Sequence, residues 1–428
     1  MSTPALAPTA RVYPLRARTA PPASPHVVAP ALRIPESAAA VVFAAVRHRG
    51  PVARDVIATA TGLSIATVNR QVSALLDASL LRERPDLAAA GAIGRPRIPV
   101  EVNHEPYLTI GVHVGARTTS IVASDLLGRT LDAVETPTPT GAVGPAMTAL
   151  ADSARRYLSR WHRRRALWAG VAVGGVVDSA AGTVDHPRLG WKAAPIGPTL
   201  AAALALPVSV ASHVDAMAGA ELLVGRREPG RTGGGSSLYV YARETVGFAQ
   251  VIDGRVHIPA GGPGTVAGLP VHSDLLEGGT LESTVSDEAV VAAARAAAII
   301  ATSGPKSSIA ELLRMARTAD APRAAAARQL LDERARVLGG AVALLRDMLN
   351  PDDLVVGGQA FTEYPDGMAE VRAAYATRSL LGARDIRVTA FGNRVQEAGA
   401  GVVSLSSIYA DPLSAVRRAS HRRAAARV

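Results

Sequence analysis

Short and hydrogen-bonding side chains lie on one face of a helix that the residue spacing predicts from position 65. Its apolar residues recur at positions i, i+4, i+7 and i+8, namely Val68, Val72, Leu75 and Leu76. The opposite face carries Ala66, Thr67, Arg70 and Ser73, with Asn69 at its border. Side chains of this kind let a helix enter a DNA major groove, because bulk would hold it away from the base edges. The pattern predicts a recognition helix.

The residues before this helix predict a turn and a helix start. Ile57 and Ala58 are apolar, and Thr61-Gly62-Leu63 then interrupts the helical pattern. Ser64 can accept hydrogen bonds from the free amides of the next first turn, so it is the expected N-cap and a candidate DNA contact. The spacing therefore predicts a helix–turn–helix.

A basic turn follows the predicted helix. Leu80 and Leu81 pack the next strand, and Gly94-Arg95-Pro96-Arg97 precedes a strand-like run. Arginines on a turn constrained by glycine and proline suit a narrow, electronegative minor groove or its phosphates, which makes Arg95 and Arg97 candidate DNA contacts. Periodicity alone also allows an ordinary three-helix unit with solvated arginines. The helix–turn–helix spacing, the following wing and the N-terminal position together favour DNA binding.

The excess of positive charge lies at the two ends of the chain. The formal net charge is +10 over 428 residues, while residues 1–35 hold four arginines and residues 412–428 hold five, with no acid in either stretch. Both ends are expected to be flexible. Attraction to a polyanion and simple solvation explain their charge equally well.

Several classes of protein are disfavoured by composition. There is no cysteine, which rules out disulfides and thiolate zinc sites and fits a reducing cytoplasm. No signal peptide is indicated, and the uncharged stretch 193–212 is broken by three prolines, so a membrane span is not expected. The expected location is the cytoplasm, at the nucleoid.

From Tyr107 onwards the pattern changes to alternating strands and helices. Strands are predicted around LTIGVHVG, WAGVAVGGVVD, LPVSVAS and SSLYVYA, and helices over 145–161 and 339–349, the latter leading into DDLVVGG. This is an α/β organisation with two similar halves. The expected domains are a tail (1–35), a winged helix–turn–helix (36–103), a two-lobed domain (104–411) and a second tail (412–428).

The order of several motifs resembles the ROK family of repressors and sugar kinases, over about residues 41–409. The motifs are GLSIATVNRQV, GRPRIPVEVN, GVAVGGVVDSAAGTVDHPRLGW, LPVSVASHVDAMAGAELLVG, LLRDMLNPDDLVVGGQAF and AGAGVVSLSSI. The resemblance implies an α/β fold: an N-terminal winged helix–turn–helix followed by a two-lobed actin/hexokinase-like ROK domain.

Set against that family, the phosphate-binding positions have changed. Where ROK kinases carry D-x-G-x-T, this chain has His113-Val114-Gly115-Ala116-Arg117, and where they carry G-T-G-x-G it has Arg243-Glu244-Thr245-Val246-Gly247. Bulky side chains and a carboxylate replace the glycines that cradle phosphates, so loss of ATP binding and of phosphoryl transfer is expected.

The sugar and zinc positions that the family implies are also altered. Ser212-His213-Val214-Asp215 stands for the family's N-D-x-N, Arg188 for an asparagine, and Gly264–Gly268 for G-E-I-G-H, while Glu282 is retained. Because the zinc cysteines are missing, no metal and no cofactor are expected. The residues expected to line a candidate effector cleft are Arg188, His213, Asp215 and Glu282. The sequence leaves open whether its ligand is a carbohydrate, another metabolite or none.

Three functions are weighed. The favoured one is a sequence-specific DNA-binding transcriptional regulator and not an enzyme, with a non-catalytic ROK domain that dimerises and senses an effector. Its expected partners are double-stranded operator DNA, as an inverted repeat, and a second copy in a homodimer or higher oligomer. The alternatives are a sugar kinase, which rests on fold alone, and a scaffold whose helix–turn–helix binds protein.

Overall fold

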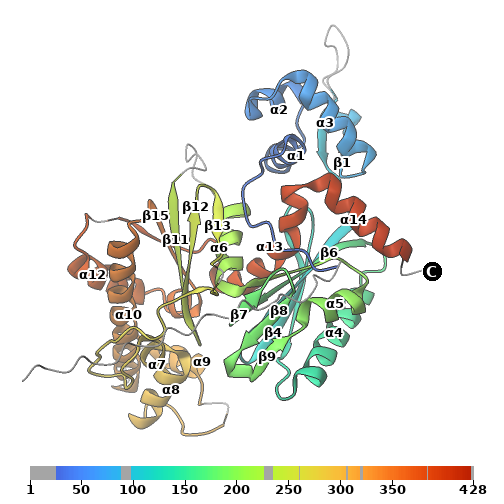
Figure 1. The fold of residues 1–428 in the computed structure, drawn as a ribbon. Coiled ribbons are helices and arrows are strands. Elements are labelled where there is room, and N and C mark those ends of the chain that lie inside the picture. Colours follow the sequence, from blue (N-terminus) through green and yellow to red (C-terminus); the bar gives the residue numbers. More distant parts are fainter. Residues whose placement is uncertain are drawn as a thin grey trace, which may run out of the picture.

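The structure is a computed structural model that describes residues 26–87, 98–225, 235–259, 261–304, 307–318, 322–382 and 384–425. A small helical module sits on one of two α/β lobes, and the second lobe lies beside the first (Figure 1). Among the helices of these ranges, none combines the length and apolar character that a bilayer crossing needs.

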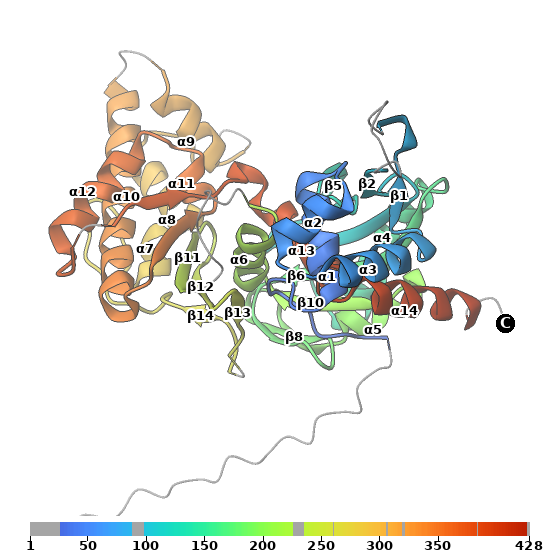
Figure 2. The ribbon, with the colours of Figure 1, turned by 90° about the horizontal axis from the view of Figure 1, so that it is seen from above.

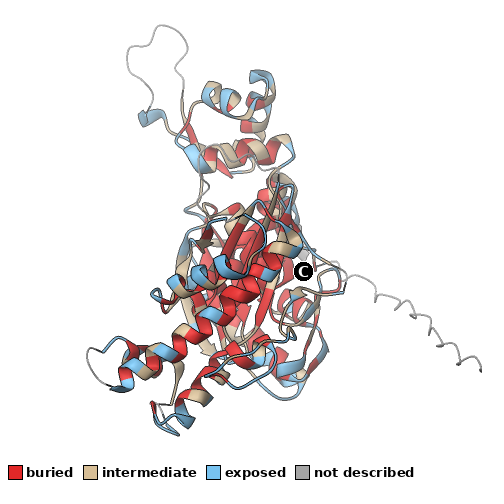
Figure 3. Cartoon of the chain, turned by 90° about the vertical axis from the view of Figure 1, so that its left-hand side faces the viewer, coloured by how far each residue is buried: buried red, intermediate tan, exposed pale blue. Residues whose placement is uncertain are grey.

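The module consists of three helices and a two-stranded sheet: α1 (Ala38–Arg49), α2 (Arg54–Thr61), α3 (Ile65–Asp77), β1 (Leu81–Glu83) and β2 (Val100–Val102). Between α2 and α3 the chain turns at Gly62, whose φ of 68° is a left-handed conformation that favours glycine. Each helix has buried residues, Phe43 in α1, Ile57 in α2 and Val68 in α3 among them, and Figure 3 shows buried and exposed stretches side by side in this module. The turn and the α3 start are therefore where the sequence predicted them.

The module is packed onto the first lobe. Its core is continuous with α13 (Val395–Ala410) and α14 (Pro412–Ala425). The ring centroids of Phe43 in α1 and Tyr409 in α13 are 6.4 Å apart, and the Arg47 guanidinium carbon lies 3.9 Å from the centre of the Tyr409 ring. Arg47 also donates to the carbonyl of Leu223 at 2.8 Å. The orientation of α1 is thus fixed by side-chain packing.

The first lobe is built on a five-stranded sheet of order β10-β6-β3-β4-β5. Its strands are β3 (Tyr107–Val114), β4 (Thr118–Ser124), β5 (Thr130–Pro137), β6 (Arg165–Val173) and β10 (Val208–Ser212). The pairs β3–β6 and β6–β10 are parallel, whereas β3–β4 and β4–β5 are antiparallel. A smaller sheet in the same lobe contains β7 (Val176–Asp178), β8 (Thr183–His186) and β9 (Trp191–Ala194).

The second lobe repeats this plan with the order β13-β12-β11-β15-β16. Its strands are β11 (Ser236–Ala242), β12 (Val246–Ile252), β13 (Arg255–His257), β15 (Asp353–Gly357) and β16 (Ile386–Val388), while β14 (Gly264–Thr265) pairs with β12. In both lobes an antiparallel meander flanks one side of the first strand and two parallel strands flank the other. The two similar halves expected from the sequence are present.

Helices cover both faces of each sheet. In the first lobe α4 (Val143–Ser159) and α5 (Ile196–Leu204) pack on one face, and α13 packs on the other. Gly111 and Gly170 are register partners there, and a Cβ on either would lie within 2.6 Å of the α13 backbone. In the second lobe α10 (Pro322–Leu349) and α12 (Gly367–Arg378) cover the outer face. The shorter helices are α7 (Leu281–Val285), α8 (Asp287–Ala296), α9 (Ile309–Ala316) and α11 (Gln359–Thr362).

The inner face of the second sheet is covered by α6 (His213–Leu223), which also contacts α13. Seen from above, α6 and α13 lie between the two sheets (Figure 2). These two helices therefore form the junction across which the lobes are connected.

Two expectations about the chain ends need correction. Residues 412–425, expected to be flexible, form helix α14, which packs against α3 and the start of β6. Residues 26–35, assigned to the N-terminal tail, run along the edges of both sheets. The buried residues of these stretches are Val27 and Leu32 in the first and Ala415, Val416 and Ala419 in the second. Composition alone did not reveal this burial.

Candidate nucleic-acid interface and interlobe cleft

The exposed face of α3 carries the predicted DNA-binding side chains. Ser64 accepts a hydrogen bond from the Thr67 amide at 3.2 Å, which caps the helix. Val68, Val72 and Leu75 are fully buried, so the opposite face points to solvent. On that face Ala66, Asn69, Arg70 and Ser73 are exposed, as is Ser64, and Thr67 is half-buried.

The wing arginines cannot be placed in the same way. Arg95 and Arg97 lie outside the described residues. At the base of the wing, Arg82 and Arg84 donate to Glu101 at 2.7 and 2.9 Å. Arg70 differs from them, because within the described part of the chain it takes part in no hydrogen bond or ion pair. Its guanidinium is therefore available to an external partner.

Helix α14 adds positive charge beside α3. A shallow groove between the two helices is lined by Ala74, Asp77, Ala78, Leu413, Val416, Arg417 and Ser420. Arg417 and Arg418 are exposed, and Ser420 accepts a hydrogen bond at 2.6 Å from Arg165, the first residue of β6. The sequence signal for this surface was the run of arginines after 412, but its position next to α3 was not predictable from composition.

A cleft of about 430 Å³ lies between the lobes. Three predicted effector residues line it: Arg188 from the 3-10 helix Pro187–Leu189, His213 at the start of α6, and Glu282 in α7. Several glycines, including Gly115, Gly175 and Gly264, also line it. This volume is large enough for a small metabolite.

Asp215, the fourth predicted effector residue, is not among the cleft-lining residues. Its side chain is buried in the first turn of α6, where it accepts a hydrogen bond from Ser212 at 2.6 Å. Burial raises the pKa of Asp215 to about 6. The expectation was wrong because the i to i+2 step along a helix turns a side chain away from its neighbour's direction.

Neutral imidazoles and a phenol ring form one wall of the cleft. The rings of His113 and His213 are nearly parallel, with centroids 6.1 Å apart, and His213 lies 5.2 Å from the Tyr241 ring. Burial lowers the pKa of His113 to about 3 and that of His213 to about 4. Near neutral pH this wall therefore offers hydrogen-bonding but uncharged groups.

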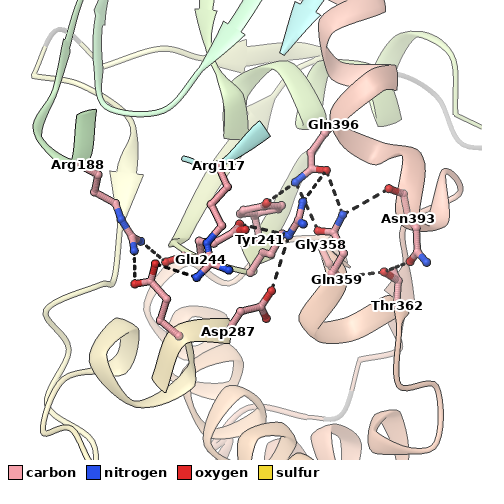
Figure 4. Close-up of polar contacts among 12 residues, drawn as sticks. Arg117, Arg188, Tyr241, Glu244, Asp287, Gly358, Gln359, Thr362, Asn393 and Gln396 are labelled. Carbon is pink, nitrogen blue, oxygen red and sulfur yellow. Dashed lines mark hydrogen bonds and ion pairs between the residues drawn. The ribbon is translucent and has the colours of Figure 1, made fainter. Parts of the chain in front are cut away.

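Ion pairs between the lobes lie beside the cleft and are here called the latch; their arginines, Arg117 and Arg188, are labelled in Figure 4. Arg117 and Arg188 of the first lobe both contact the carboxylate of Glu288 in α8, at 3.2 and 2.5 Å. Arg188 also donates to the carbonyl of Glu244 at 2.5 Å and lies 3.8 Å from Glu282. Arg117 and Glu288 were not predicted as site residues.

The β11–β12 turn corresponds, by the resemblance, to a phosphate-binding loop of ROK kinases. In this chain its own charged side chains occupy the turn. The Arg243 and Glu244 side chains are 3.2 Å apart, and Arg243 donates to Gln396 at 3.3 Å. Asp287 approaches Arg243 at 3.8 Å and pairs with the buried Arg334 at 2.7 Å. Gln396 in turn donates to the hydroxyl of Tyr241 at 2.8 Å. This network places a carboxylate at the β11–β12 turn.

His272 lies in the segment that corresponds, by the resemblance, to the family's zinc-binding cysteines. His272 is 91% exposed and its nearest acidic partner is Asp274, at 3.4 Å. Among the described residues, no three or more histidine, aspartate or glutamate side chains are grouped so that they could hold a metal ion.

Comparisons with known proteins agree with this geometry. The sequence model of the ROK family matches residues 109–406. The "Transcriptional regulator Rv0485" of Mycobacterium tuberculosis is 68% identical over 401 residues, which cover 92% of this chain and 90% of that protein.

Solved structures show the same fold. A crystal structure of a ROK family transcriptional regulator, described as a homologue of the E. coli MLC protein, has a TM-score of 0.68 at 20% identity, covering 89% of this chain and 96% of that one. A ROK family glucokinase from Streptomyces griseus, in complex with glucose and AMPPNP, has a TM-score of 0.59 at 22% identity, covering 69% and 99%. The regulator's alignment extends over more of this chain than the glucokinase's does.

Proposed function

This chain belongs to the ROK family, and we propose that it is a DNA-binding transcriptional regulator in which α3 reads the operator. The observation that carries the proposal is the exposed face of α3, where the side chains of Asn69, Arg70 and Ser73 take part in no hydrogen bond or ion pair among the described residues. A guanidinium placed so can form two hydrogen bonds with a guanine edge. The name of the 68% identical relative supports the same function.

The test begins with the purified full-length chain and fragmented genomic DNA. We expect a small set of fragments to be recovered and footprinting to reveal one protected sequence within them. Binding should weaken steeply as salt rises, because phosphate contacts release counterions. Recovery of fragments without any shared sequence, or binding that does not depend on salt, contradicts the proposal.

We further propose that the regulator acts as a homodimer on an inverted repeat. Two modules related by a twofold axis match half-sites whose centres are separated by whole turns of DNA. Sedimentation of the free protein should give a dimer, and the footprint should be a (pseudo)palindrome. A monomer that protects a single half-site is the contrary result.

We propose that the interlobe cleft holds an effector and performs no phosphoryl transfer. Glu244 puts a carboxylate at the β11–β12 turn, where it would repel a nucleotide's phosphates. The neutral His113 and His213 suit an uncharged, hydroxyl-bearing ligand such as a carbohydrate. Arg188, His213 and Glu282 are the side chains proposed to contact it.

Calorimetry with magnesium-ATP and a glucose phosphorylation assay test the negative half of this proposal. We expect calorimetry to show no heat of binding at micromolar nucleotide concentrations. We expect the phosphorylation assay to show no formation of sugar phosphate. Elemental analysis is expected to give no bound zinc. Micromolar nucleotide affinity, turnover, or one zinc per chain would contradict the corresponding statement directly.

A further inference from the structure

Residues 26–36, here called the strap, begin at the edge of the first lobe. The Val28 amide donates to the Val208 carbonyl at 2.8 Å, and the Val208 amide donates to the His26 carbonyl at 2.9 Å. Val27 is thereby a parallel bridge partner of Val208, and its side chain is 8% exposed. The strap thus continues the first sheet beyond its edge strand β10.

The strap then crosses the junction between the lobes. The side chain of Leu32 is 3% exposed and lies on Gly219 of α6, where a Cβ would come within 2.8 Å of it. The Ala31 amide donates to the Ser406 hydroxyl of α13 at 3.3 Å. Both junction helices are therefore in contact with this short stretch.

The far half of the strap pairs with the edge of the second lobe. The Val256 amide donates to the Leu32 carbonyl at 2.9 Å, and the Ile34 amide donates to the Gly254 carbonyl at 2.8 Å. Glu36 adds an exposed ion pair to Arg255 at 3.2 Å. The backbone of the strap is hydrogen-bonded to both sheets.

The strap leads into the module without an intervening linker. Ser37 follows Glu36 directly and accepts from the Ala40 amide at 3.3 Å as the N-cap of α1. The Ser37 hydroxyl also donates to the carbonyl of Ala410 at the end of α13. Helix α1 is therefore held by the first lobe while the chain that enters it is held by the second.

We infer that the strap transmits the relative position of the two lobes to the DNA-binding module. Four residue steps separate the Val28 amide, bonded to β10, from the Leu32 carbonyl, bonded to β13. The chain between them can therefore follow only a short movement of β13 relative to β10, even if the turn at Leu32, closed by the Arg33 amide and the Ala31 carbonyl at 2.8 Å, is pulled open. Opening of the cleft must then either break the strap's hydrogen bonds with one lobe or pull the start of α1. The inference rests on the proposed DNA-binding function, and it names the element by which a cleft event reaches α3.

A double-mutant cycle on the full chain tests this coupling without an identified effector. Glu288→Arg places a third guanidinium against Arg117 and Arg188 and opens the latch by repulsion. Ile34→Pro removes the amide that binds Gly254 and so frees the strap from the second lobe. Each variant and their combination are titrated with operator DNA at one salt concentration.

With the strap intact, Glu288→Arg is expected to change operator affinity about fivefold or more, a usual size for coupling between sites. In the Ile34→Pro background the same change should be less than about twofold. Ala29→Pro is the matched control, because within the described residues its amide has no hydrogen bond and the strap stays attached. Leu32→Ala loosens the same half of the strap through lost packing and introduces no proline. It should weaken the effect of Glu288→Arg as Ile34→Pro does, and it replaces Ile34→Pro if the proline disturbs folding.

Lobe movement is followed in the same variants. The chain has no cysteine, so single cysteines introduced on each lobe and on α2 carry spin labels without background. An equal effect of Glu288→Arg in both backgrounds, or no effect in either, overturns the coupling. Failure of the wild-type chain to bind any DNA would instead refute the proposed function.

Discussion

The exposed face of α3 and the interlobe cleft use their polar groups in opposite ways. On α3, Arg70 points to solvent and binds no described residue. In the cleft, Arg117, Arg188 and Arg243 are each engaged with a carboxylate or a carbonyl of the same chain. The exposed face of α3 thus keeps a cation available to a partner, whereas the arginines of the cleft are paired within the chain.

This contrast explains how a kinase-like scaffold serves a regulator. A phosphoryl-transfer site needs amides and cations that await an anionic substrate. Here the corresponding turn is neutralised internally by Glu244 and Asp287. What the cleft retains is a space of about 430 Å³ between the two lobes.

The largest expected effect concerns a buried pair beneath the cleft. Arg334→Leu leaves Asp287, whose side chain is 5% exposed, without its partner at 2.7 Å. Arg243, 3.8 Å from Asp287, compensates this charge only in part, so the loss should approach the cost of an unpaired buried charge, about 3–5 kcal/mol in the free energy of unfolding. Urea denaturation should show this loss, while Arg372→Leu, on the exposed side of α12, should change little. A decrease below about 1 kcal/mol in the free energy of unfolding of Arg334→Leu would mean that the Arg334–Asp287 pair does not stabilise the fold.

A pH series on the imidazole wall should give the next largest effect. Because burial lowers the pKa of His113 to about 3 and that of His213 to about 4, the unfolded chain binds more protons as pH falls below about 6.5. Each histidine should then remove up to about 1.4 kcal/mol of stability per pH unit. The raised pKa of Asp215 acts oppositely between about pH 6 and 4 and offsets one histidine.

Denaturation midpoints of the wild type and of His113→Asn/His213→Asn, measured from pH 7 to pH 5, check this sign. The wild type should lose stability toward acid and the double variant should lose less. Identical slopes would show that these imidazoles are not held neutral by burial.

A smaller effect is expected from α14, which extends the free positive charge beside α3. Arg417→Gln/Arg418→Gln should lower the slope of log affinity against log salt by about 0.9 for each lost phosphate contact. The preferred DNA sequence should stay the same. Arg372→Gln serves as the distant control, and an unchanged slope in the α14 variant would assign its charge to solvation alone.

The smallest effect is expected at the latch itself. Glu288 and Arg117 are 48% and 59% exposed, so Glu288→Gln should cost at most about 1 kcal/mol of stability. The loss of this ion pair should instead change the distance between spin labels placed on the two lobes. A loss of stability well above this value would show that the latch contributes to folding stability, contrary to the prediction.

Local patterns in the sequence were sufficient to predict the module and the two α/β lobes that follow it. The position of α3 followed from the spacing of Val68, Val72 and Leu75 and from the Ser64 cap, all of which are local features. The two similar halves followed from strand-like runs. Both signals come from residues close together in the chain.

Contacts between distant segments were not predictable. Arg117 and Glu288 are 171 residues apart, and Arg188 and Glu288 are 100 apart. The strap and α14 looked like basic or proline-rich tails, because nothing in their own composition shows the sheet edge and helix they pack against. Asp215 was misplaced because the family motif gave its neighbourhood but not the direction of its side chain.

The central claim is that α3 reads DNA through the side chains on its exposed face. Binding-site selection with the wild type and with Arg70→Ala tests this claim most directly. The wild type should enrich one inverted repeat. Arg70→Ala should lose about 1–3 kcal/mol of operator affinity and its preference at one base pair of each half-site, with unchanged stability. Selection of the same sequence, at the same affinity, by Arg70→Ala would contradict the account.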